Sequence, residues 1–361
     1  MKAGVVGAGI MGRLVAFSLI NAGWEVILFD REDHHSETNC SAAAAGLLAP
    51  VAELDKSDPI IYELGEDAFC YWQNIMDKLA DVIYFRRLGS LIVSHPRDQS
   101  ELGRFIHMIA SKIKHKKNYQ AVTEEKIKQL EPELSKFSTG YFFPSEGQLD
   151  NQSLLKALWI YLHEKKVTWC MNSFIQELKP GQINVNGEIK KFDMVFDCRG
   201  LGAKSVFKTL RGIRGELIWL HAPDVNIERP VRLLHPRYSL YVVPRPHHTY
   251  ILGASEIESE DTSSISVRTT MELLSAAYYL HAGFVEARVI KTVVNHRPTL
   301  SDHLPKMKYT NGLIAVNGLY RHGYLIAPTL MDEVERYLKN GIASVRYPQL
   351  WEKWHDYDTV Q

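Results

Sequence analysis

Residues 3–30 carry the pattern that most constrains how this chain can fold. The apolar run AGVV is followed by Gly7, Gly9 and Gly12 in a G-x-G-x-x-G arrangement. The next segment, IMGRLVAFSLINAG, has the apolar periodicity of a helix, and WEVILFD predicts a second strand that ends at Asp30. Strand, glycine turn, helix, strand and acid in this order are typical of a dinucleotide-binding βαβ unit.

Each position in this pattern has a physical reason. Gly7 permits the tight turn, Gly9 lets a pyrophosphate approach the backbone, and Gly12 lets the helix pack closely on the strand. The free amides at the start of the helix favour a phosphate, and the Asp30 carboxylate can accept hydrogen bonds from a ribose. We therefore predict a dinucleotide site here.

The same segment is a poor export signal or membrane anchor. Arg13 interrupts the apolar run, and no small-residue cleavage site follows before the polar stretch DREDHHSE. The run is also shorter and more broken than the about 20 apolar residues that span a bilayer. We expect no membrane span.

Composition narrows the class of protein further. The chain has 361 residues, and its 42 Lys and Arg balance 42 Asp and Glu, which disfavours nucleic acid or an anionic membrane as the main partner. The four cysteines, Cys40, Cys70, Cys170 and Cys198, form no C-x-x-C pair. We expect no metal site, no disulfide scaffold and a reducing cytoplasm.

The rest of the chain alternates between two kinds of segment. CSAAAAGLLAP predicts either a helix start capped by Ser41 or a backbone that lies against a flat ligand. DMVFDC predicts another buried strand, whereas residues 215–255 contain apolar runs separated by turns and predict antiparallel strands. The end of the chain predicts a strand, a glycine-rich loop and a helix with Pro328 near its start.

These segments predict an α/β chain, α+β overall, with a Rossmann-like nucleotide domain that is discontinuous in sequence. We assign residues 1–85, 145–214 and 290–361 to that domain. Residues 86–144 and 215–289 would form a second, substrate-binding domain on an antiparallel sheet.

Seven stretches together resemble one family. They are GAGIMG with Asp30, CSAAAAGLLAP, DCRGLGA, RGELIWL, LYVVPRP…ILGAS, NHRPTLSDHLP and GLYRHGYLIAP. Running from residue 4 to about residue 330, they are similar to the FAD-dependent amine oxidases related to D-amino-acid oxidase, and most of all to the glycine oxidase of thiamine biosynthesis.

The resemblance implies FAD as the cofactor and assigns its contacts. Asp30 and Arg31 would hold the adenosine ribose, Phe174 would present its backbone to the adenine, and the helix after the C-terminal loop would direct its amide end at the flavin ring. The remaining implied contacts are Gly7, Gly9, Ile10, Met11, Gly12, Cys40, Ser41, Ala45, Gly46, Leu47, Leu319, Tyr320, Arg321, His322, Gly323, Tyr324 and Leu325.

The resemblance also implies the substrate side of the site. Arg297 would grip an amino-acid carboxylate with its guanidinium fork, with Tyr241 and Arg321 nearby. On residue type alone, an arginine before proline is more often in a surface salt bridge and a strand tyrosine is more often in the core. Asn295, His296, His303 and His322 depart from the family pattern and bear on the range of substrates.

The activity so implied is oxidative deamination of glycine or another small amino acid to an imine or 2-oxo acid, with molecular oxygen as acceptor and hydrogen peroxide as product. A thiazole synthase would be a partner that consumes the imine. The alternatives are a D-amino-acid dehydrogenase with a quinone acceptor, an oxidase module of a tRNA-modifying enzyme, which the zero net charge disfavours, and a non-catalytic flavin-binding protein. Assembly into a homo-oligomer stays open.

Overall fold

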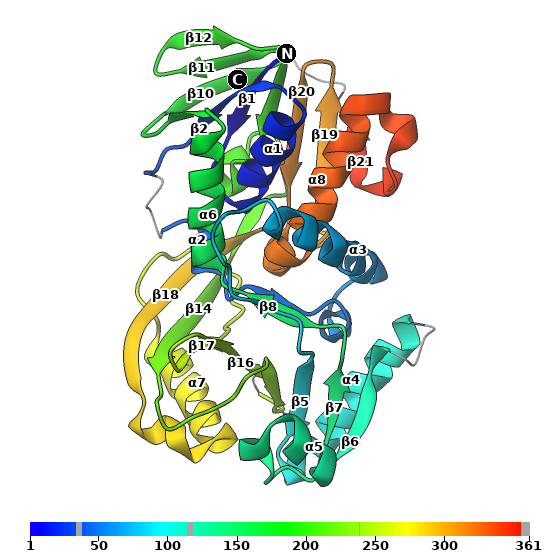
Figure 1. Ribbon diagram of the computed structural model, residues 1–361, viewed down its shortest axis with the longest axis vertical. Coiled ribbons are helices and arrows are strands. Elements are labelled where there is room, and N and C mark those ends of the chain that lie inside the picture. Colours follow the sequence, from blue (N-terminus) through cyan, green and yellow to red (C-terminus); the bar gives the residue numbers. More distant parts are fainter. Residues whose placement is uncertain (34–37, 114–117, 238, 355–361) are drawn as a thin grey trace.

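Two large sheets organise the protein, one toward each end of its long axis (Figure 1). This computed structural model describes residues 1–33, 38–113, 118–237 and 239–354. One large sheet is mostly parallel and the other is mostly antiparallel. The predicted α/β fold with a second, antiparallel sheet is therefore confirmed.

The first sheet has seven strands and contains the βαβ unit predicted from residues 3–30. β1 pairs in parallel with β2 on one side and β13 on the other, and the pairing continues in parallel to β9 and β20. These central strands are apolar and largely buried, as parallel strands covered on both faces must be. In spatial order the strands are β21 (Trp351–Lys353), β19 (Lys306–Thr310), β20 (Leu313–Asn317), β13 (Met194–Asp197), β1 (Lys2–Val6), β2 (Glu25–Phe29) and β9 (Thr168–Cys170).

Helices cover one face of this sheet and form the main core with it. α1 packs against α6 and α8, and α8 also packs against α3. The eight α-helices of the described residues are α1 (Ile10–Asn21), α2 (Cys40–Ala43), α3 (Pro59–Met76), α4 (Gln99–Lys112), α5 (Glu124–Leu130), α6 (Asn151–Glu164), α7 (Val267–Leu280) and α8 (Gly323–Asn340). On the other face lies a small sheet of β10 (Ile175–Lys179), β11 (Gln182–Val185) and β12 (Glu188–Lys191).

Helix α8 begins earlier than the sequence predicted. Its first residue is Gly323, so Pro328 lies inside the helix rather than near its start. Proline has no N–H, and the carbonyl of Tyr324, four residues earlier, therefore lacks its helical partner. The buried indole of Trp72 in α3 donates to that carbonyl at 2.9 Å. The indole thus satisfies the carbonyl that the proline leaves without a helical partner.

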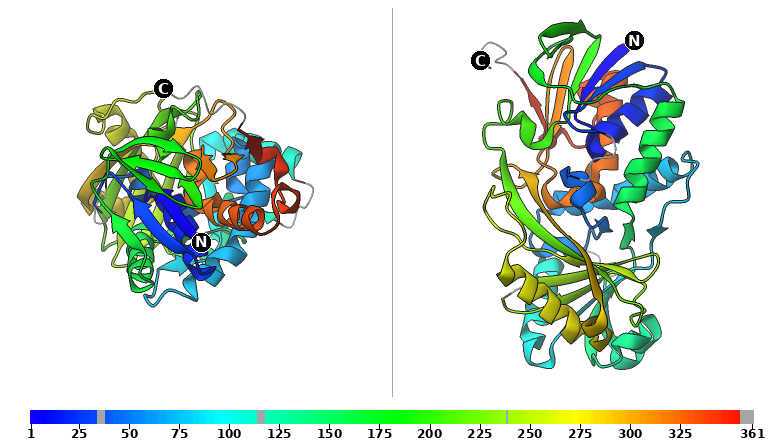
Figure 2. Two further views of the ribbon diagram at one scale, coloured as in Figure 1. Left: turned by 90° about the horizontal axis from the view of Figure 1, so that it is seen from above. Right: turned by 90° about the vertical axis from the view of Figure 1, so that its left-hand side faces the viewer.

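The second sheet has eight strands, and the antiparallel strands predicted for residues 215–255 lie in it. Every pairing is antiparallel except that of β15 with β5. Helix α7 lies along one face of this sheet (Figure 2). In spatial order the strands are β18 (Arg288–Thr299), β14 (Arg211–His221), β17 (Thr249–Gly253), β16 (Ser239–Arg245), β15 (Val231–Leu234), β5 (Ser90–Ser94), β7 (Thr139–Phe143) and β6 (Gln120–Thr123).

A short three-stranded sheet, β3 (Leu47–Leu48), β8 (Gly147–Leu149) and β4 (Phe85–Arg86), joins segments that are distant in sequence. The domain boundaries drawn from the sequence remain a proposal. By sheet membership, residues 288–299 would move to the second unit, because β18 pairs with β14 along its whole length.

Candidate functional site

A cavity of about 510 Å³ is lined by residues of both large sheets. The seven-stranded sheet contributes the carboxyl ends of β1, β2 and β20, where ligands bind in open α/β folds. The eight-stranded sheet contributes side chains of β14, β16 and β18. A cavity of this size is in the range of cofactor and substrate pockets.

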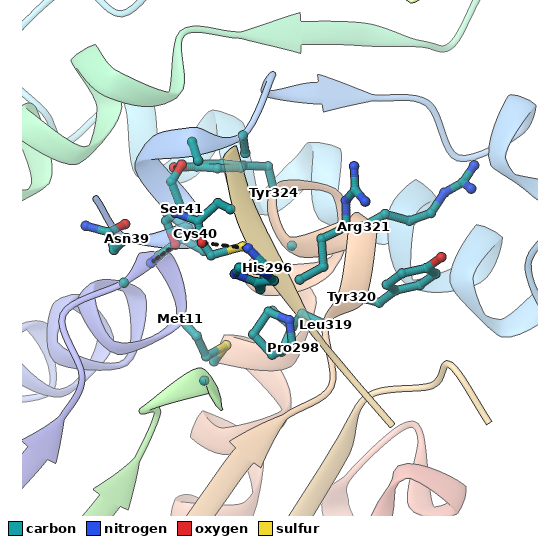
Figure 3. Close-up of a pocket in the computed structure, with 18 of the residues that line it drawn as sticks. Met11, Asn39, Cys40, Ser41, His296, Pro298, Leu319, Tyr320, Arg321 and Tyr324 are labelled. Atoms are coloured by element: carbon teal, nitrogen blue, oxygen red, sulfur yellow. Dashed lines mark hydrogen bonds between the residues drawn. The ribbon is translucent and has the colours of Figure 1, made fainter. Parts of the chain in front are cut away.

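The cavity brings together the residues that the sequence singled out. Every predicted contact of cofactor or substrate lines it except Gly12. Figure 3 shows Asn39, Cys40 and Ser41 on one side, with Tyr320 and Arg321 on the other. Phe174 and Arg31 are largely exposed at its edge. Which of these residues contact a ligand stays a prediction.

The glycine turn at the start of α1 leaves no room for side chains. Gly7 has a φ of 96°, and a Cβ there would lie 2.5 Å from the carbonyl oxygen of Cys198. A Cβ at Gly12 would lie 1.8 Å from the carbonyl oxygen of Gly7. Gly12 does not line the cavity, but its lack of a side chain lets the helix pack closely on the glycine turn. Gly9, at the N-cap position of α1, has no side chain that could cap the helix, and this amide end lies at the cavity.

Ser41 does not cap α2, which contradicts the first of the two sequence-based alternatives for this segment. Helix α2 begins at Cys40, so Asn39 occupies the cap position and its side chain accepts from the Ala42 amide at 2.9 Å. The Ser41 hydroxyl instead accepts from the Ile10 amide at 2.9 Å. Ser41 thereby ties the small-residue segment to the glycine turn.

A buried ionic cluster forms the wall at the Arg321 end. Glu53, in the 3₁₀ turn Ala52–Asp55, pairs with Arg232 of β15 at 2.7 Å and with Nε of Arg321. Arg321 also pairs with Glu256 through Nη1 at 3.3 Å, and the Tyr320 hydroxyl donates to Glu256.

Ion pairing and burial set the protonation states of Glu53 and His322 in this cluster. Burial would raise the pKa of Glu53, but Arg321 and Arg232 hold that pKa far below its usual range, so Glu53 is ionised at neutral pH. Burial lowers the pKa of His322 to about 4, so its imidazole is neutral. Nδ1 of His322 has no hydrogen-bond partner within the described part of the chain, although it lies 3.6 Å from Glu53.

Arg297, the predicted carboxylate-binding arginine, is not held by an acid. Its two Nη atoms donate to the Ser255 carbonyl at 3.2 Å each, and no carboxylate of the described residues forms an ion pair with it. A Cβ at Gly215 would lie 2.4 Å from Nη2 of Arg297, so the glycine makes room for the guanidinium. Tyr241 lines the same cavity from β16, and burial raises the pKa of its phenol.

Comparison with known proteins agrees with this geometry. A model of the family described as FAD dependent oxidoreductase matches residues 2–331. A relative from Rhizobium etli, named for a thiamine biosynthesis oxidoreductase ThiO, is 35% identical over 339 residues, covering 94% of this chain and 96% of its own. The chain belongs to the FAD dependent oxidoreductase family.

Solved structures share the fold of this oxidoreductase. Glycine oxidase from Geobacillus kaustophilus has a TM-score of 0.83 at 18% identity, with 98% of this chain and 99% of that chain covered. Iminodiacetate oxidase from Chelativorans sp. BNC1 has a TM-score of 0.82 at 21% identity, with 97% and 99% covered.

FAD is the cofactor of this family, and the cavity is suited to it. The crowded glycine cradle and the amide end of α1 suit a pyrophosphate, and the neutral, unpartnered Nδ1 of His322 offers a polar atom at the opposite end. Helix α8 also lacks a side-chain cap, and its first residues line the cavity. Among the described residues, no group of His, Cys, Asp and Glu could hold a metal ion. Within the same residues, no helix has the length and apolar character to cross a membrane.

Asp30 gives a direct test of the nucleotide end. Its carboxylate accepts from the Ala8 amide and, at 2.9 Å, from the Glu32 amide, which fixes it beside the glycine turn. We expect Asp30→Ala to weaken FAD binding by about 1–3 kcal/mol, as for hydrogen bonds to a charged group. Flavin fluorescence titration of the apoprotein measures this change. Unchanged FAD affinity would remove Asp30 from the site.

Glu146 predicts a pH dependence of folding. It is fully buried behind the Glu53 turn, where it accepts from the Ala52 amide at 2.6 Å and contacts the Ser90 hydroxyl. Burial raises the pKa of Glu146 from 4.5 to about 7.

Between those two pH values the folded protein keeps a proton that the unfolded chain has lost, so the free energy of unfolding falls as pH rises. The native protein should lose about 3 kcal/mol of unfolding free energy across this pH range through Glu146, at about 1.4 kcal/mol per pKa unit. The Glu146→Gln variant should not show this loss. Urea denaturation at pH values across this window, at fixed FAD, measures the slope. A variant with the same slope as the native protein would contradict the assignment.

Sequence reasoning missed the ionic cluster. Glu53, Arg232 and Glu256 all line the cavity, yet none lies in a recognisable motif. Asn39 was missed as well, although an asparagine three residues before the alanine run is a cap signal that could have been used.

Proposed function

We propose that this FAD dependent oxidoreductase oxidises glycine or another small amino acid to its imine, which hydrolyses to the 2-oxo acid. The observation that carries the proposal is Arg297, a cavity-lining guanidinium without an acidic partner among the residues described. A cation of this kind is available for a carboxylate brought in by a ligand. The Rhizobium etli relative and the solved glycine oxidase support the same choice.

The chain's own residues would orient the substrate. Arg297 would hold the carboxylate by its fork, and the Tyr241 hydroxyl, protonated because burial raises its pKa, would donate a further hydrogen bond. FAD, when bound, supplies the two-electron oxidising chemistry. The uncapped amides of α8 would stabilise negative charge that develops beside them.

We also propose the setting of the reaction. Oxygen would be the final acceptor and hydrogen peroxide the second product, and a thiazole synthase of thiamine biosynthesis would consume the glyoxylate imine. The cytoplasm suits a chain whose four cysteines are all free. We propose that the unit around the seven-stranded sheet binds FAD and that the eight-stranded sheet supplies the substrate residues.

A peroxide assay tests the proposal. Purified protein with a flavin spectrum is supplied with glycine, sarcosine and D-alanine, and with methylamine as a control that lacks the carboxylate. We expect peroxide from at least one amino acid and little from methylamine. Turnover with a quinone but not with oxygen would favour a dehydrogenase, and no turnover with any acceptor would favour a non-catalytic flavoprotein.

A further inference from the structure

The charges around the Arg321 end of the cavity balance without Arg297. The acids are Glu53, Asp55 and Glu256, and the bases are Arg232, Arg321 and Lys56. Each base lies within ion-pair distance of at least one of these acids. Arg297 is therefore the one arginine of this region left for a substrate anion, among the described residues.

Arg321 is held from two sides. Its Nε contacts Glu53, and its Nη1 lies 3.3 Å from Oε2 of Glu256. Glu256 is itself fixed by the Tyr320 hydroxyl and by Lys56 at 3.5 Å. A carboxylate from this chain thus already occupies the accessible edge of Arg321.

One loop serves both arginines. Ser255, which follows β17, gives its carbonyl to Arg297, and the next residue, Glu256, gives its carboxylate to Arg321. Burial opposes ionisation of Glu256, but the Tyr320 hydrogen bond and Arg321 lower its pKa, and Arg297 lowers it further. Glu256 is therefore negative at neutral pH and lies in the field of both cations.

We propose that Glu256 restricts this enzyme to amines with a single carboxylate, because it occupies Arg321 in the way a second substrate carboxylate would. This inference rests on the proposed function, in which Arg297 binds the first carboxylate. A dicarboxylic amine would find Arg321 neutralised and would meet the negative charge of Glu256.

Sarcosine and iminodiacetate form a matched pair of probes, because they differ only by a carboxylate on the N-methyl group. In Glu256→Gln the amide oxygen still accepts the hydrogen bond from Tyr320. The negative charge that faces Arg321 is removed, and Arg321 itself stays positive. We expect the ratio of kcat/KM for iminodiacetate to kcat/KM for sarcosine to rise about tenfold or more, the size of one charge-assisted hydrogen bond. The side chain of Glu256 is 38% exposed, so the variant should fold, and its flavin content checks this.

Glu258→Gln is the matched control. Glu258 lies two residues further along the loop, pairs with Arg211 at 3.1 Å and does not line the cavity. The Glu258→Gln substitution also removes one negative charge, but it leaves the ion pairs of Arg321 unchanged. A rise of the ratio in both variants, or in neither, would overturn the proposal.

Calorimetric titration of the holoenzyme separates this inference from the proposed function. We expect malonate to gain affinity relative to acetate in Glu256→Gln and not in Glu258→Gln. This result without any amine turnover would support the charge restriction and contradict the oxidase assignment. Turnover of sarcosine with unchanged malonate affinity in Glu256→Gln would contradict the restriction alone.

Discussion

Replacement of Arg297 by alanine is expected to lower kcat/KM for the best amino-acid substrate by about 10²–10³-fold, or about 3–4 kcal/mol of transition-state binding. The physical reason is that the substrate carboxylate would then lie in the cavity without a cation, since the other arginines described there are paired with acids. Steady-state kinetics by peroxide formation measure the change, with flavin content and thermal unfolding as checks that the variant folds.

Arg297→Lys is the matched control for charge. It should restore only part of the activity, because an ammonium keeps the charge but cannot form the two parallel hydrogen bonds of the guanidinium. Methylamine, which has no carboxylate, should remain a poor substrate and respond little to either change. Native-like kinetics with amino acids in Arg297→Ala would make Arg297 a structural residue and would refute the assigned substrate site.

Glu53→Gln is expected to lower the free energy of unfolding by about 3–5 kcal/mol, because it removes the shared anion from two buried arginines. Arg232 and Arg321 both bond to this carboxylate, and both side chains are largely buried. Arg321 would keep Glu256, and Arg232 would keep Asp55 only at 3.7 Å. Urea denaturation at neutral pH and a fixed excess of FAD measures the loss, because FAD itself stabilises the folded state.

Glu258→Gln again serves as control, since its exposed ion pair with Arg211 should contribute little. The pKa of Glu53 is lower in the folded protein than its ordinary value of 4.5, so its stabilising contribution is present above that pH and is lost as pH falls below it. The difference between native protein and Glu53→Gln should therefore shrink in acid. A difference that is small at neutral pH, or that is independent of pH, would contradict the role given to the cluster.

Local signals made the nucleotide end of the fold predictable. Residues 3–30 form strand, turn, helix and strand in sequence, and the steric need for Gly7 and Gly12 follows from that local geometry. The errors were local too, because the start of α2 decides whether Asn39 or Ser41 is the cap. The helix through Pro328 could not be foreseen, since the indole that compensates for the missing N–H comes from Trp72, 252 positions away from Tyr324.

The charges of the cavity lie beyond such reasoning. Glu53 meets Arg232 at a separation of 179 residues and Arg321 at 268. These side chains come together only where the two sheets meet around the cavity. No residue spacing in the sequence predicts this contact. Arg297 could be named from a motif, but its lack of an acidic partner, which gives it a role, is visible only in the folded chain.

Anaerobic mixing of the purified flavoprotein with glycine tests the central claim most directly. If the enzyme oxidises small amino acids, the visible absorption of the flavin should be lost on mixing with glycine, sarcosine or D-alanine, and should return when air is admitted, with peroxide formed. Methylamine should leave the spectrum unchanged. At low amino-acid concentration, the flavin absorption of the Arg297→Ala variant should decrease at least about 10²-fold more slowly than that of the native protein. A flavin spectrum that none of the amino acids changes would contradict the account.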